Sequence, residues 1–210
     1  MEHPELARLI DVMATLRRRC PWDAQQTHRS LVQYLIEETA ETIEAIESGD
    51  HDHLREELGD LLLQVIFHAE IAQEADTGFT VDDIAADIAD KLIARHPYVF
   101  AAEQTPPDLY GSWERRKAAE KGRTSVLDGI PEQLSALARA NKIISRARLQ
   151  AVPVELPSEP VSANDLGAQV LALIARAQAS GIDPDQAVRD AVRSLEAEVR
   201  AAEADRAPGD

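Results

Sequence analysis

The chain has little of several things, and each shortage excludes a class of protein. Cys20 is the only cysteine among 210 residues, so no intrachain disulfide can form and a cytoplasmic location is expected. No apolar run approaches the roughly 20 residues of a membrane-spanning helix. The start, Met1–Glu5, lacks a basic region followed by an apolar run, so no signal peptide is expected.

Glycine and aromatic residues are also sparse. There are nine glycines and 4% aromatic residues, whereas Ala, Leu, Glu and Arg are plentiful, a balance that favours helix over sheet. Every strong apolar period is helical, so we predict an all-α helical bundle. The expected helices cover about 4–19, 30–47, 52–75, 80–96, 112–121, 131–149, 162–180 and 184–204.

Positive charge is scarce as well. The chain has 22 basic residues against 38 acidic ones and a formal net charge of −16. This balance argues against a nonspecific nucleic-acid binder, whose contact surface is usually basic. It does not exclude a nucleotide substrate, because a metal ion can bridge an acidic protein and an anionic phosphate. We expect neither a nucleic-acid partner nor a membrane partner.

What the chain does have is two pairs of carboxylates, Glu38-x-x-Glu41 and Glu57-x-x-Asp60, separated by a break at Gly49. Residues three apart share one face of a helix. A hairpin of the two helices would therefore bring four carboxylates together in one cleft. Such a cluster repels itself unless a cation holds it, and hard oxygen ligands suit Mg²⁺, with Mn²⁺ as a substitute.

The alternative is that these acids are ordinary solvated surface. Asp60 argues against it, because its neighbours on a helical wheel are the apolar residues Leu63, Phe67 and Ile71. A carboxylate there costs several kcal/mol unless it is paired or binds metal. Residues 37–60 contain ten acids and one Arg or Lys, Arg55, so local ion pairs cannot neutralise the set. We interpret the cluster as a metal site.

A phosphate substrate also needs cations. Lys91 and Arg95 lie four apart near the end of a predicted helix, and Trp113 and Lys117 lie four apart on a later one. These pairs fit phosphate and nucleotide contacts. The first pair fits equally well a basic patch favoured by the helix dipole, and the second fits surface packing.

Between Leu16 and Lys117 the chain resembles the MazG family, the all-α nucleoside triphosphate pyrophosphohydrolases. The family pattern Glu-Glu-x-x-Glu, a spacer and Glu-x-x-Asp is met in full. The motifs are Cys20-Pro21-Trp22-Asp23, Gln26-Thr27-His28, Tyr34-Leu35-Ile36-Glu37-Glu38, Glu56-Glu57-Leu58-Gly59-Asp60, Phe67-His68-Ala69, Asp90-Lys91-Leu92, Arg95-His96-Pro97 and Trp113-Glu114-x-x-Lys117.

The resemblance implies Mg²⁺-dependent hydrolysis of nucleoside triphosphates to monophosphate and pyrophosphate, by metal-activated water attacking the α-phosphate. It implies a role in nucleotide-pool house-cleaning and a four-helix catalytic core completed across a homodimer or a higher oligomer. Carried over by position, the metal ligands are Glu38, Glu41, Glu57 and Asp60, with Glu37 beside them as a ligand or base.

The same resemblance assigns substrate contacts. Lys91 and Arg95 would hold the phosphates, and Trp113 and Lys117 would close over the nucleotide. His53 stands where some members have a lysine, so that phosphate contact becomes pH-dependent. Trp22 either lines the base pocket with His28 or belongs to a packed helix junction.

The C-terminal half contains a weak repeat of the acidic hairpin. Asp165-Leu166-Gly167-Ala168 resembles Glu57-Leu58-Gly59-Asp60, but Ala168 replaces the last acid. We therefore predict a MazG-like catalytic domain at 1–122, a connecting helix and Pro-rich linker at 123–160, a degenerate and catalytically silent helical pair at 161–205, and a disordered tail at 206–210.

Three other functions stay open from the sequence. The chain could prefer one substrate, as dUTP, dCTP and phosphoribosyl-ATP pyrophosphatases do. It could instead sense nucleotides or bind a partner without catalysis. It could also be a purely structural acidic helical protein.

Overall fold

The computed structural model describes residues 3–206, and within them the all-α prediction is confirmed. These residues form nine α-helices and one short 3₁₀ helix, with no strand among them. The chain divides into two compact units, the first ending at Ala102 and the second starting at Glu103. Within the described residues, no helix is both long and apolar enough to cross a bilayer.

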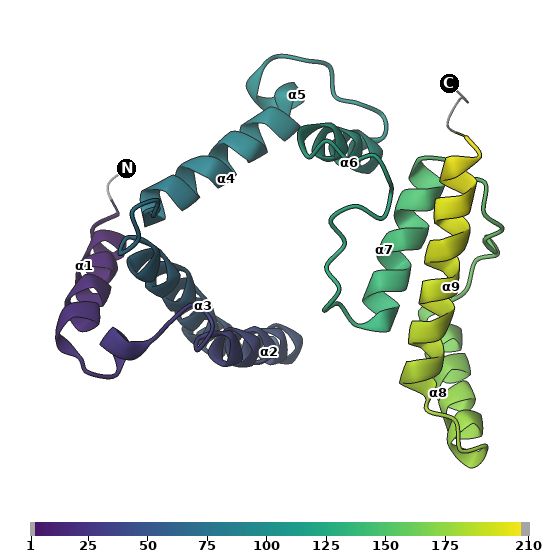
Figure 1. Cartoon of the computed structure of the whole chain (residues 1–210), viewed down its shortest axis with the longest axis horizontal. Helices are drawn as coiled ribbons and strands as arrows, with labels where there is room; N and C mark the ends of the chain where they lie inside the picture. The colour runs from purple at the N-terminus through teal and green to yellow at the C-terminus, as the bar shows by residue number, and fades with distance from the viewer. Residues whose placement is uncertain (1–2, 207–210) are drawn as a thin grey trace. The chain divides into compact units, whose positions relative to one another are not determined.

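The first unit is built on the hairpin of α2 (Val32–Ser48) and α3 (His51–Ala72), which lie side by side in Figure 1. Gly49 ends α2 with a left-handed φ of 73°, which glycine adopts without steric cost. Asp50 then caps α3 by accepting hydrogen bonds from the backbone nitrogens of Asp52 and His53. The sequence break at Gly49 therefore produces the predicted turn.

The other elements of the first unit are α1 (Pro4–Arg19), the 3₁₀ helix η1 (Asp23–Gln25), α4 (Val81–Arg95) and the short α5 (Pro97–Phe100). Its core contains Met13, Leu31, Ile66 and Phe67, all almost fully buried. This core joins α1 to the C-terminal half of α3, beyond the acidic residues. The part of the hairpin that carries the acidic residues is thus anchored by this hydrophobic core.

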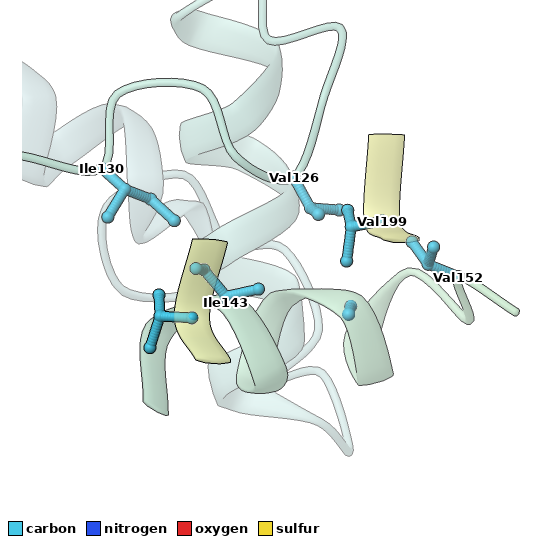
Figure 2. Packing of buried hydrophobic residues seen from close by; sticks show 7 residues of the cluster. Val126, Ile130, Ile143, Val152 and Val199 are labelled. Carbon is cyan, nitrogen blue, oxygen red and sulfur yellow. The ribbon is translucent and has the colours of Figure 1, made fainter. Parts of the chain in front are cut away.

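The second unit contains α6 (Leu109–Glu120), α7 (Ala136–Leu149), α8 (Ala163–Ala179) and α9 (Pro184–Ala204). Its core is a cluster of seven buried residues centred on α7 and α9, with the labelled residues of Figure 2 among them. Val126 and Ile130 reach this core from the loop before α7. The loop is therefore held in place by its own side chains.

The start of α7 differs most from the sequence-based expectation. The sequence predicts a helix over 131–149, but α7 begins at Ala136, and the side chain of the preceding Ser135 accepts a hydrogen bond from the backbone nitrogen of Ala138. The preceding residues instead form the turn that brings Ile130 into the core. The division into compact units at residues 102 and 103 does not test the predicted domain limits, which stay a prediction. The predicted tail at 206–210 lies outside the described residues, except for Arg206.

A candidate metal centre on the acidic helix hairpin

The α2–α3 hairpin brings three of the four predicted metal ligands together. Glu38, Glu41 and Glu57 each offer one carboxylate oxygen, and these three atoms lie within 4.8 Å of one another. Glu38 and Glu41 come from one face of α2, and Glu57 faces them from α3. The three-residue spacing that the sequence displays is therefore converted by the hairpin into a cluster of oxygens.

The burial of the cluster is uneven. Glu57 is 7% exposed, Glu38 is half-buried and Glu41 is exposed. Glu57 is also fixed by His53 one turn earlier, whose Nε2 lies 3.1 Å from Glu57 Oε1. Glu57 is thus buried and fixed in position, whereas Glu41 is open to solvent. A site that exchanges ligands needs such an open side.

Asp60 lies near the cluster but outside the group of three. It is half-buried, and its negative charge acts on Glu38. Burial is the largest cause that raises the pKa of Glu38, followed by the negative charges of Asp60, Glu41, Glu57 and Glu37. The carboxylates therefore repel one another, and a divalent cation would relieve that repulsion. The all-oxygen donor set fits a hard cation such as Mg²⁺ or Mn²⁺.

The sequence singled out Asp60 as the acid that most needs compensation, but the structure buries Glu57 more deeply. The residues that share the Asp60 side of the helical wheel, including Leu63, Phe67 and Ile71, belong to the core further along α3. Glu57 instead shares a side with Gln64, which is 5% exposed. Packing against α2, which helical periodicity does not specify, decides which acid is covered.

The predicted substrate residues occupy several places. Lys91 is on α4, with its Nζ 3.8 Å from Asp87 Oδ2, and Arg95 is the last residue of that helix. In the second unit, the Lys117 ammonium lies 4.5 Å from the ring centre of Trp113. The predicted shared face of Trp113 and Lys117 is therefore a direct cation–π contact. Glu37 is exposed on α2, next to the cluster in sequence.

Trp22 lies just before η1 and belongs to an aromatic group. It makes edge contacts with Tyr34 and Phe67 at ring-centre distances of 5.8 and 6.3 Å, while 49% of it stays exposed. These contacts fit the packed-junction interpretation, although the exposed part of the indole leaves an apolar surface at the same place.

Sequence reasoning did not anticipate a pair of stacked histidines. The rings of His28 and His68 stack with centres 5.1 Å apart, and their Nδ1 atoms are 2.8 Å apart. Burial, and secondly the charge of His28, lower the pKa of His68. The residues lie 40 positions apart, so no local spacing could have indicated the pair.

The fold and the cluster define an all-α protein with a candidate divalent-metal centre on a helix hairpin. A sequence model described as the MazG nucleotide pyrophosphohydrolase domain matches residues 26–100, which include the whole hairpin. An uncharacterised 26.1 kDa protein of Streptomyces cacaoi is 47% identical over 204 residues, covering 94% of this chain and 83% of that protein.

Two similar proteins are named nucleoside triphosphate pyrophosphohydrolase. The one from Mycobacterium tuberculosis is 45% identical over 78% of this chain and 52% of its own length. The one from Escherichia coli K12 is 45% identical over 68% of this chain and 57% of its own length. This chain belongs to the MazG family. It spans about half the length of these two named relatives.

Proposed function

We propose that this chain hydrolyses nucleoside triphosphates to nucleoside monophosphate and pyrophosphate in a reaction that requires Mg²⁺. The enzyme class is the one that its relatives in Mycobacterium tuberculosis and Escherichia coli are named for. The observation that supports the proposal most strongly is the group of Glu38, Glu41 and Glu57 oxygens within 4.8 Å of one another. The proposed role is house-cleaning of the nucleotide pool.

The proposed metal ligands are Glu38, Glu41, Glu57 and Asp60. A bound divalent cation would neutralise the carboxylates, polarise the α-phosphate and help ionise the attacking water. Burial of Glu57 and its contact with His53 would hold one side of the ligand set in place before substrate arrives. Glu41 is exposed, and so it can adjust when the triphosphate enters.

In the proposed reaction the oxygen of a water molecule bonds to the α-phosphorus, and the bond from that phosphorus to the α–β bridging oxygen breaks. Pyrophosphate leaves with the bridging oxygen. The proton of the water passes to a carboxylate, for which the exposed Glu37 is our candidate. Lys91 and Arg95 would neutralise the charge that develops on the departing pyrophosphate, and Trp113 and Lys117 would contact the nucleotide.

We also propose that the chain works as a homodimer. Both helices of the hairpin expose large apolar side chains: Ile36, Ile43 and Ile46 on α2 are each more than half exposed, and Leu58 on α3 is 50% exposed. Exposed apolar surface of this extent is typical of a contact between proteins. Light scattering should give twice the chain mass, and Ile43→Asp should reduce it; a wild-type monomer at micromolar concentration would contradict the proposal.

Activity can be tested with a panel of standard and damaged nucleoside triphosphates, measuring pyrophosphate with Mg²⁺ or with a chelator. We expect turnover with Mg²⁺, and weaker turnover with Mn²⁺ as the substitute. Glu41→Gln should lower kcat by about 100-fold or more, because it removes a metal ligand, whereas the exposed neighbour variant Glu56→Gln should keep kcat. Normal turnover of Glu41→Gln, or no turnover of any nucleotide by wild type, would contradict the proposal.

A further inference from the structure

The second unit contains a strongly basic pocket of about 560 Å³ between the end of α6, the loop after it and α7. Its charged lining residues are Lys117, Lys121, Arg123, Asp128, Lys142 and Arg146. The chain has four lysines in all and a net charge of −16, yet three of those lysines line this one pocket. Chance placement of a solvated surface does not explain such a concentration.

Two helices build the pocket in the same way. Lys117 and Lys121 are one turn apart on α6 and at its C-terminal cap, and Lys142 and Arg146 are one turn apart on α7. Side chains four apart point to the same side of a helix. Each helix therefore presents a pair of cations, and Arg123 adds a fifth from the loop that joins them.

Arg146 is the buried floor of the pocket. It is 3% exposed, and its Nη1 donates to the carbonyl oxygens of Val126 and Asp128 at 2.9 Å each. Its Nε lies 3.6 Å from Glu114 Oε2, too far for a hydrogen bond. Among the described residues, Nη2 has no hydrogen-bond partner. A buried guanidinium with an unused donor is costly, since buried polar groups are normally paired.

The nearby acids do not supply the missing partner. The same oxygen of Glu114 also faces Arg123, whose Nη1 is 3.3 Å away, so one carboxylate is shared by two guanidinium groups. The Asp128 carboxylate accepts hydrogen bonds from the backbone nitrogens of Thr124 and Ser125. Burial, and then the positive charge of Arg123, lower the pKa of Arg146, which is the expected effect of an uncompensated positive charge.

We propose that this pocket binds a compact anion with two or more linked phosphate groups. Five cations lie near three carboxylates, those of Asp128, Glu114 and Glu120, the last of which is 3.8 Å from Lys121 Nζ. The excess of two positive charges is more than a single monovalent anion would balance. Guanidinium forks and ammonium groups are the usual protein partners of phosphate oxygens. Free pyrophosphate and the triphosphate end of a nucleotide share this chemistry.

The pocket is distinct from the acidic hairpin, and its proposed binding does not depend on the hydrolytic activity proposed above. Every lining residue belongs to the second unit, and residues 37–60 contribute none. Lys117 is the one lining residue that also appears among the proposed nucleotide contacts. The test is therefore built on Lys142, which has no role in the proposed reaction.

The experiment is calorimetric titration of the full chain at low ionic strength, with a chelator present to remove divalent cations. The probes are inorganic pyrophosphate, a nucleoside triphosphate analogue with a non-hydrolysable α–β link, and orthophosphate. We expect one pyrophosphate per chain, much weaker binding of orthophosphate, and an affinity that falls as salt is added. Competition by the analogue would identify the nucleotide triphosphate as a second source of the ligand; its failure to compete would restrict the site to free oligophosphates.

Variants locate the binding. Lys142→Ala should weaken pyrophosphate binding by about tenfold or more, the loss expected for one charged hydrogen bond, and Lys142→Arg should restore much of it. Arg176→Ala removes an exposed charge on α8, and Glu41→Gln alters the acidic hairpin; both should bind as wild type does. No pyrophosphate binding by wild type, or equal binding by Lys142→Ala, would overturn the proposal.

Discussion

The substitution Glu57→Gln separates a metal site from ordinary acidic surface. Glutamine has nearly the same shape as glutamate, so the change removes one charge from a buried position without opening a cavity. Glu57 is 7% exposed and its carboxylate lies within 4.8 Å of those of Glu38 and Glu41. We predict that this variant is more stable than wild type without metal, and that it loses the stabilisation that metal gives to wild type.

The expected size follows from the distances. Two unit charges 4.8 Å apart repel by about 1 kcal/mol in water and by about 3.5 kcal/mol at an effective dielectric constant of about 20. Glu41 is exposed, which places its repulsion near the lower value. Removing two such repulsions, and losing the contact with His53, leaves a net gain of about 1–2 kcal/mol. For a unit of this size that raises the melting temperature by roughly 4–10 °C.

The assay is thermal unfolding followed by circular dichroism, with a chelator and with increasing Mg²⁺. Wild type should gain about 2.7 kcal/mol when Mg²⁺ is present at 100 times its Kd, and Glu57→Gln should gain far less. Glu56→Gln is the matched control, because it removes the same charge from an exposed neighbour. A Glu57→Gln variant that melts below wild type in chelator, or that Mg²⁺ stabilises as strongly as wild type, would contradict the assignment of Glu57 as a metal ligand.

Three further predictions concern other parts of the chain. Lys91→Ala should raise KM for a nucleoside triphosphate by about tenfold with little change in melting temperature; an unchanged KM would remove Lys91 from the proposed phosphate contacts. The pKa of His68 is below its ordinary value of 6.5, so the contribution of His68 to stability should be complete above pH 6.5 and fall as the pH drops below it. Urea unfolding between pH 5 and 7 should show that the free energy of unfolding depends less on pH in His68→Gln than in wild type. An unchanged pH dependence would contradict this. In Gly111→Ala the new Cβ would overlap the Asp108 carboxylate that caps α6 and lie 2.8 Å from Leu149 Cδ1. Denaturant unfolding should therefore show a free energy of unfolding lower by about 1–3 kcal/mol. Gly167→Ala is the control, because nothing lies within 4 Å of its Cβ, and it should be neutral or stabilising.

The sequence predicts the fold and the acidic hairpin well because both depend on local patterns. Helical periodicity and the turn at Gly49 are enough to place Glu38, Glu41 and Glu57 on facing helices. The degree of burial of each acid is not local. It depends on which side of α3 packs against α2. The helical wheel therefore predicts that Asp60 is the buried acid, whereas in the structure Glu57 is buried more deeply.

The features that the sequence did not reveal all join distant segments. The stacked histidines come from the chain before α2 and from α3, and the basic pocket combines α6, a loop and α7. For the pocket a local signal did exist, because Lys142 and Arg146 are spaced by one helical turn. That spacing alone does not predict an anion-binding pocket. The pocket also requires the burial of Arg146 and the sharing of Glu114 between two guanidinium groups, which only tertiary packing determines.

Cleavage at the α-phosphorus distinguishes the proposed reaction from other hydrolyses of a nucleoside triphosphate, and isotope labelling detects it. Hydrolysis of a nucleoside triphosphate in ¹⁸O-labelled water, with Mg²⁺, should place one labelled oxygen in the nucleoside monophosphate and none in the pyrophosphate, which mass spectrometry resolves. Label in pyrophosphate, or release of orthophosphate and nucleoside diphosphate, would contradict it.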